Sequence, residues 1–301
     1  MNNLYIDEFF SKIRNREAIL DRFIEKIPDI NEQKRRAPYK GYTVLMIACL
    51  LGTSELVKKI LKRTDIDVNL RSTVTGTTAL DMAVYSLDKN IITAITSANN
   101  IDVNMRDNNG NTPLMNIIVF KHKRIPEIID IFLNLRNIDI NIQNSQGDTA
   151  LMLAIKWHSS FNKDTVNKLL SRPDINVNLQ SIAGYNALML ATFNGHSDTI
   201  KKLLSRPDID IYAQNNKGET ALLIATKYRS HSISKIFEKL VGYPTLHARY
   251  RGHGTCLSKH DIQNIQNIQN IPTSCFDTVM QDDYEIRDYL NATDVTDKKE
   301  Q

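Results

Sequence analysis

The eight residues GDTALMLA, at positions 147–154, belong to a pattern that occurs six times between residues 41 and 225. Related octads are GYTVLMIA from Gly41, GTTALDMA from Gly76, GNTPLMNI from Gly110, GYNALMLA from Gly184 and GETALLIA from Gly218. Consecutive octads begin 35, 34, 37, 37 and 34 residues apart, so the units have nearly constant length. A fixed period of this size is the sequence signature of a repeat protein.

Each octad is followed by two further blocks at near-constant distances. The second block is amphipathic; TIKKLLSR, at 199–206, has apolar residues at helical spacing and lysines on the other side. The third block reads DVN at Asp67 and Asp102, DIN at Asp139, NVN at Asn176 and, more weakly, DIY at Asp210. In the octad itself, Leu and Ala recur at helical spacing, Thr or Asn caps the helix, and the glycine suits a tight turn. The repeating unit is therefore helix, short loop, helix and hairpin-like turn.

The octads resemble the T-P-L-H-x-A signature of the ankyrin repeat family. The resemblance covers residues 41 to 241, and it implies an all-α fold, an ankyrin repeat solenoid with about six repeats. Only the third repeat keeps the proline, and none keeps the histidine. The histidine place is occupied by Met46, Asp81, Met115, Met152, Met189 and Leu223. We therefore expect apolar packing to replace the hydrogen bonds of that histidine, with Asp81 as the outlier.

The chain divides into three parts on this pattern. Residues 1–40 read as an N-terminal helical cap, a degenerate repeat that ends in the PDIN of residues 28–31. Residues 41–241 form the ankyrin repeat domain, with repeats starting near 41, 76, 110, 147, 184 and 218. Residues 242–301 lose the periodicity and include IQNIQNIQN at 262–270, so we expect a low-complexity, flexible tail.

Composition excludes several classes of protein. The content of 42% hydrophobic and 24% charged residues is typical of a folded soluble protein. The net charge of +4 is small for 301 residues and offers no bulk attraction to nucleic acid or to an anionic membrane. Three cysteines without paired spacing favour a reducing compartment, and no apolar run is long enough to span a bilayer. We expect an intracellular, cytoplasmic protein that works as a monomer.

The chain lacks a recognisable catalytic motif, so we expect no enzyme activity and no cofactor. The alternative is a small zinc-dependent or enzymatic module in the tail, with the repeats as its targeting domain. Its candidate ligands are His253, Cys256, His260 and Cys275, in an order unlike the familiar paired-cysteine patterns.

The family resemblance implies that a protein partner binds on the concave face, which hairpin tips and first helices form. Alignment of the repeats by their glycines places a ladder of large side chains on that face. The ladder consists of Tyr85, Phe120, Trp157, Phe193 and Tyr228, with Lys156 and Lys227 beside it. A polar rim would come from the hairpin residues Arg106, Gln143 and Gln180, with Arg71 and Gln214 at equivalent places. Exposed aromatic residues in a row indicate an interface; the alternative is that some of the rings pack down onto the neighbouring hairpin.

The repeats are rich in Asn and Ile and have Met in place of the signature histidine. In this composition the chain is similar to the ankyrin repeat proteins of large DNA viruses that infect amoebae. This resemblance implies an adaptor that acts on host proteins within a host cell.

Overall fold

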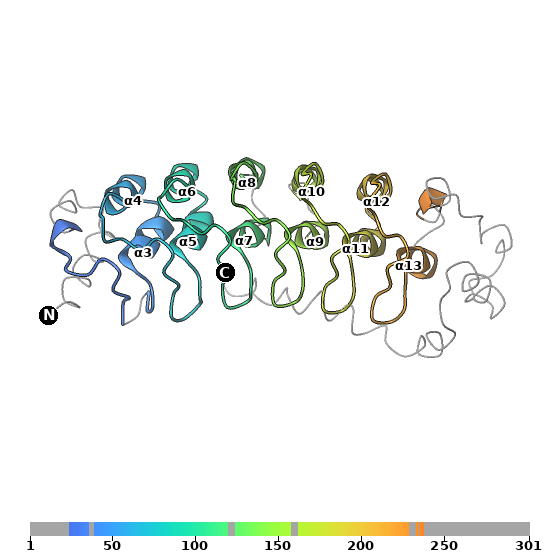
Figure 1. Ribbon diagram of the computed structural model, residues 1–301, viewed down its shortest axis with the longest axis horizontal. Coiled ribbons are helices and arrows are strands. Elements are labelled where there is room, and N and C mark those ends of the chain that lie inside the picture. Colours follow the sequence, from blue (N-terminus) through green and yellow to red (C-terminus); the bar gives the residue numbers. More distant parts are fainter. Residues whose placement is uncertain are drawn as a thin grey trace, which may run out of the picture.

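The computed structural model describes residues 24–35, 39–119, 124–157, 162–228, 233 and 235–237. The helices in these ranges lie in two rows, from which the hairpin loops project along one edge (Figure 1). The row next to the hairpins contains the first helix of each repeat: α3 (Val44–Leu50), α5 (Ala79–Ser86), α7 (Pro113–Val119), α9 (Ala150–Lys156), α11 (Ala187–Asn194) and α13 (Ala221–Tyr228). The other row contains the second helices: α4 (Ser54–Ile60), α6 (Lys89–Thr96), α8 (Ile125–Leu133), α10 (Asn162–Leu170) and α12 (Ser197–Leu204). This arrangement confirms the predicted solenoid.

The first helices begin where the sequence predicts, because the residue after each hairpin caps them. Thr149 Oγ1 accepts a hydrogen bond from the Met152 backbone N–H at 3.3 Å, and Asn186 Oδ1 accepts one from Met189 N–H at 2.9 Å. The octad glycines have positive φ angles, as the turn requires. At Gly110, with φ of +75°, an added Cβ would lie 2.6 Å from the Ser145 backbone nitrogen of the next repeat. Glycine is thus needed there both for its conformation and for the close approach of two hairpins.

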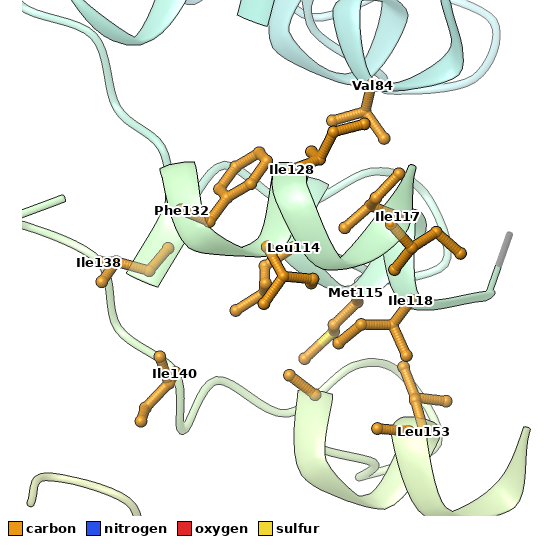
Figure 2. Close-up of a cluster of buried hydrophobic side chains, with 14 of the residues drawn as sticks. Val84, Leu114, Met115, Ile117, Ile118, Ile128, Phe132, Ile138, Ile140 and Leu153 are labelled. Atoms are coloured by element: carbon orange, nitrogen blue, oxygen red, sulfur yellow. The ribbon is translucent and has the colours of Figure 1, made fainter. Parts of the chain in front are cut away.

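The core runs the length of the solenoid between the two rows. In the third repeat, Leu114, Ile117 and Ile118 of α7 pack beside Ile128 and Phe132 of α8, as Figure 2 shows. Small buried alanines in the first helices let neighbouring repeats approach closely. The methionines at 46, 115, 152 and 189 are all buried, so apolar side chains do occupy the histidine place in these four repeats.

A ladder of asparagines joins successive repeats. Asn104 Nδ2 donates to the Asn137 carbonyl at 2.7 Å, and its Oδ1 accepts from the Asp139 backbone N–H at 2.9 Å. The same pair of bonds to the next repeat is made by Asn31, Asn69, Asn141 and Asn178. Tyr212 occupies the next place in this column. The asparagines of the third blocks therefore have a structural role.

The segment before the first octad joins the same stack. Asn31 belongs to the asparagine ladder, and Arg63 of the first repeat donates to the carbonyls of Ile24 and Ile27 at 2.6 and 3.1 Å. Arg172 and Arg206 make the equivalent contact with the preceding repeat. Residues 24–35 thus pack as a degenerate repeat; residues 1–23 and 238–301 lie outside the described ranges.

Candidate partner-binding face

The hairpin loops and first helices form a continuous surface, which we call the hairpin face. It comprises residues 33–50, 71–86, 106–119, 143–157, 180–194 and 214–228, apart from 36–38, which are not described. Its hairpins are joined tip to tip: Ser145 N–H donates to the Asn109 carbonyl at 2.9 Å, and Ile182 N–H to the Gln146 carbonyl at 2.9 Å. Because each tip is bonded to the next, the face is a rigid platform.

The predicted aromatic ladder lies on this face, but its rings are half-buried instead of fully exposed. Tyr85, Trp157, Phe193 and Tyr228 all pack against the core with part of each side chain left at the surface. Phe193 and Tyr228 contact each other edge to face, with ring centroids 5.6 Å apart. Phe120 lies outside the described residues. The four described rings of the ladder thus also contribute to the packing of the core.

The two lysines of the predicted site have different surroundings. Lys156 Nζ lies 2.7 Å from an Asp148 carboxylate oxygen, and the two side chains are only 10% and 5% exposed. Burial raises the pKa of Asp148, and the charge of Lys156 opposes that rise. Lys227 Nζ lies 3.2 Å from Glu219 and 4.7 Å from the centroid of the Tyr228 ring, with 29% of its side chain exposed. Lys156 is therefore mainly a buried ion pair, whereas Lys227 presents charge at the surface.

The predicted polar rim folds back onto the hairpins. Arg106 Nε donates to the Gly110 carbonyl at 3.1 Å. Gln143 Nε2 donates both to the Gly147 carbonyl of its own hairpin, at 2.7 Å, and to the Gln180 carbonyl of the next, at 2.8 Å. Gln180 makes the equivalent pair of bonds, with Gly184 and Gln214. The side-chain amides of these glutamines therefore stabilise the hairpin stack. The sequence pattern had placed both glutamines in a polar rim that contacts a partner.

A buried polar cluster beneath Tyr85 escaped sequence reasoning. Asp81 is fully buried; its Oδ2 accepts from the Thr78 backbone N–H at 2.8 Å, and its Oδ1 from Asn116 Nδ2 at 2.9 Å. Asn116 Nδ2 also lies 3.3 Å from Asp107 Oδ2. Burial raises the pKa of Asp81 to about 6, the hydrogen bonds from Thr78 and Asn116 oppose the rise, and the negative charge of Asp107 adds to it.

The same cluster affects the tyrosine above it. Burial, and after it the charges of Asp81 and Asp107, raise the pKa of Tyr85, so its hydroxyl stays protonated at neutral pH. The sequence signal for the cluster was available: Asp81 and Asn116 are polar residues in helix columns that are otherwise apolar.

Comparison with known proteins agrees with this architecture. The family model for ankyrin repeats matches three times, at residues 11–107, 87–181 and 158–244. The chain belongs to the ankyrin repeat family. Ankyrin repeats are protein–protein interaction modules.

Solved structures share the fold. The ankyrin repeat protein EF0377 is 27% identical with a TM-score of 0.57, and the match covers 66% of this chain and 98% of that one. The ankyrin repeat domain of Bcl-3 is 19% identical with a TM-score of 0.63, over 78% and 97% of the two chains. A chain from the complex of the endopeptidase Bd0816 of Bdellovibrio bacteriovorus with immunity protein Bd3460 is 24% identical with a TM-score of 0.53, over 66% and 99%. No curated protein sequence matches the chain.

The remaining sequence predictions concern metal and membrane. His253, Cys256, His260 and Cys275 lie outside the described residues, so the predicted zinc arrangement stays a prediction. Within the described residues, no group of three or more potential ligands is placed to hold a metal ion. Among the helices of those ranges, none has the length and apolar character to cross a membrane.

Proposed function

We propose that this ankyrin repeat chain binds a partner protein on its hairpin face, with the aromatic ladder as the centre of the contact. The observation that carries the proposal is the burial of the rings. Tyr85, Trp157, Phe193 and Tyr228 are each held by the core while part of the ring stays at the surface. Such rings lose little conformational entropy on binding, which is why large aromatic side chains dominate the energetics of many interfaces.

The C-terminal half of the ladder has the best-defined geometry. The edge-to-face pair of Phe193 and Tyr228, with the ammonium of Lys227 beside the Tyr228 ring, joins an apolar surface to a positive charge. Val119, in the middle of the face, adds an exposed apolar side chain. This combination suits an extended or helical segment that carries apolar residues and at least one acidic residue.

The proposed biological setting is that of an adaptor from a large DNA virus of amoebae, which recruits a host protein in the host cytoplasm as a monomer. The support is the Asn- and Ile-rich sequence with methionine in the signature histidine place. A virus that carries such repeats gains new partners by changing exposed residues, because the buried columns that maintain the stack are left untouched.

The test compares affinity capture from amoebal lysate by the wild-type chain and by the Trp157→Ala/Phe193→Ala variant. A matched control, Ile131→Ala/Leu204→Ala, truncates two partly buried apolar residues in the row of second helices. Circular dichroism and urea unfolding establish that each variant is folded under the capture conditions. A protein retained by the wild type and the control but lost from the ladder variant, with binding then repeated on purified components, supports the proposal. Equal retention by all three chains refutes the proposed site.

A further inference from the structure

The exposed charges of the hairpin face are of one sign. In its described residues, the carboxylates are Asp81, Asp107, Asp148 and Glu219, and all four are buried. Each carboxylate accepts hydrogen bonds or forms an ion pair within the protein. The acidic residues of this face are therefore not exposed for direct contact with a ligand.

The charged residues of the same face that reach solvent are basic. They are Arg35, Lys40, Arg71, Arg106, Lys217 and Lys227. Arg71 and Arg106 are oriented by a bond from Nε to a hairpin carbonyl, at 3.1 Å in both cases. Arg35 also lies 3.6 Å from Glu32, just outside the face. The face as a whole presents positive charge at both of its ends.

The row of second helices differs, because its surface mixes both signs and pairs them. Lys58 lies 2.8 Å from Glu55 in α4, and Lys163 of α10 lies 2.8 Å from Asp198 of α12. The modest net charge of the chain thus conceals a difference between the two sides of the solenoid: the exposed charges of the hairpin face are basic, whereas those of the second-helix side are of both signs. A charged ligand distinguishes these sides, since exposed charges act over about a Debye length, ~8–10 Å at physiological salt.

The sequence contains a segment with the complementary charge. Residues 277–297 include seven acidic residues and one basic residue. Tyr284, Ile286, Tyr289 and Leu290 are interspersed among the acidic residues. Thirty-nine residues lie between Phe237 and Asp277 along the chain, and at about 3.3 Å per residue they can reach about 130 Å. The segment is therefore long enough, and tethered closely enough, to meet the hairpin face of its own chain.

We propose that the acidic segment 277–297 is an intramolecular ligand of the hairpin face, where it competes with the partner protein. Single exposed ion pairs contribute little to binding, so the free segment would bind weakly. The tether raises its effective concentration to the millimolar range, which makes several weak contacts sufficient. A partner must then displace the segment, and rising salt weakens the intramolecular contact.

The first experiment is zero-length carbodiimide cross-linking of the full chain at low concentration, followed by peptide mapping of the monomer. We expect isopeptide bonds from carboxylates of residues 282–288 to Lys40, Lys217 and Lys227. The matched controls are Lys62, Lys89 and Lys201, which are exposed but belong to the second-helix side. Hairpin-face lysines should be linked severalfold more often than these controls, and an isotope-mixed sample separates links within one chain from links between chains. Equal frequencies, or links only between chains, overturn the proposal.

The second experiment uses Trp157, the only tryptophan in the chain, which lies on the hairpin face as a built-in probe. The full-length variant Asp282→Asn/Asp283→Asn/Glu285→Gln removes charge from the segment without touching the face. At low salt the wild type should show a Trp157 emission spectrum different from that of the variant, and high salt should make the two spectra coincide. Identical spectra at every salt concentration overturn the proposal. So does emission that responds only to an added oligonucleotide, which would assign the basic face to nucleic acid. Neither experiment requires the partner, so failure here leaves the proposed function standing.

Discussion

The polar contact between the second and third repeats makes a sharp stability prediction. Asn116 of α7 donates to fully buried Asp81 of α5 at 2.9 Å. The equivalent places in the fourth and fifth repeats hold Leu153 and Leu190, so leucine fits this helix position. The substitution Asn116→Leu removes this donor from a buried carboxyl group whose pKa in the wild type is about 6, so the wild-type group is mainly ionised at pH 7. Leaving a buried charged acceptor without its donor costs about 2–3 kcal/mol of the free energy of unfolding.

The pH dependence follows from the pKa of Asp81. In the folded chain the pKa is raised to about 6, whereas the unfolded value is close to 3.9. The folded state therefore binds the proton more tightly, and wild-type stability falls as the pH rises from about 4 to about 6. A shift of two units corresponds to about 3 kcal/mol, an upper limit for this contribution. Methionine occupies the Asp81 position in four other repeats, so Asp81→Met should remove this pH dependence of stability. The free energy of unfolding of the variant relative to wild type should therefore rise between about pH 4 and about pH 6.

The assay is urea unfolding followed by far-UV circular dichroism at pH 4.5 and 7.5, for wild type, both single variants and the double variant. Asn116→Leu should lose more stability at pH 7.5 than at pH 4.5, because protonation of Asp81 lessens the need for a donor. In the Asp81→Met background the loss should shrink, with a coupling energy of about 1–3 kcal/mol. Losses that are additive, or equal at the two pH values, would falsify the assignment of a charged Asp81 stabilised by Asn116.

Three further predictions concern stability and use the same unfolding assay. Asn141→Ala removes two hydrogen bonds between repeats and should lower the free energy of unfolding by about 2 kcal/mol. The control Asn109→Ala, at an exposed residue, should cost less than about 0.5 kcal/mol, and similar values for the two variants would contradict the asparagine ladder. Gly52→Ala should cost about 1–2 kcal/mol, because φ is +72° there although no atom lies within 4 Å of the added Cβ. Gly110→Ala should cost clearly more, because its Cβ would also meet the Ser145 backbone nitrogen, and equal losses would refute this difference. Lys156→Met removes the partner of a buried carboxylate and should cost about 3–5 kcal/mol; a neutral effect would contradict the assignment of a buried ion pair to Lys156 and Asp148.

Much of the fold was predictable because it depends on spacing. The recurrence of the octad and its two companion blocks indicates both helices, and the Thr or Asn before the first helix marks its start. Thr149 and Asn186 cap their helices as expected. One structural role is shared by the asparagines of four third blocks, since one contact repeated at a constant period needs only one explanation; these are Asn69, Asn104, Asn141 and Asn178.

The candidate site was harder to predict, because side-chain direction does not follow from spacing. Gln143 and Gln180 are long enough to reach either a ligand or a carbonyl of their own hairpin, and they take the carbonyl. Lys156 likewise forms an ion pair with Asp148, which lies eight residues earlier, just before α9. Only the folded structure shows that these two side chains meet. Asp81 and Asn116 belong to different repeats, and each stands in a helix position that is apolar in the other repeats. Alignment of equivalent positions therefore does not predict their contact.

The asparagine ladder has a consequence for how such a chain changes length over evolutionary time. Asn104 and Asn141, 37 residues apart, present the same two groups to the repeat that follows each of them. Recombination that duplicates or deletes one whole unit between such points rejoins surfaces that already match. The Asp81–Asn116 contact is the exception, because it joins the second and third repeats through two side chains that the other repeats lack. Recombination that separates these two repeats would leave the Asp81 carboxylate without this donor. Variation in repeat number is therefore expected to spare that junction.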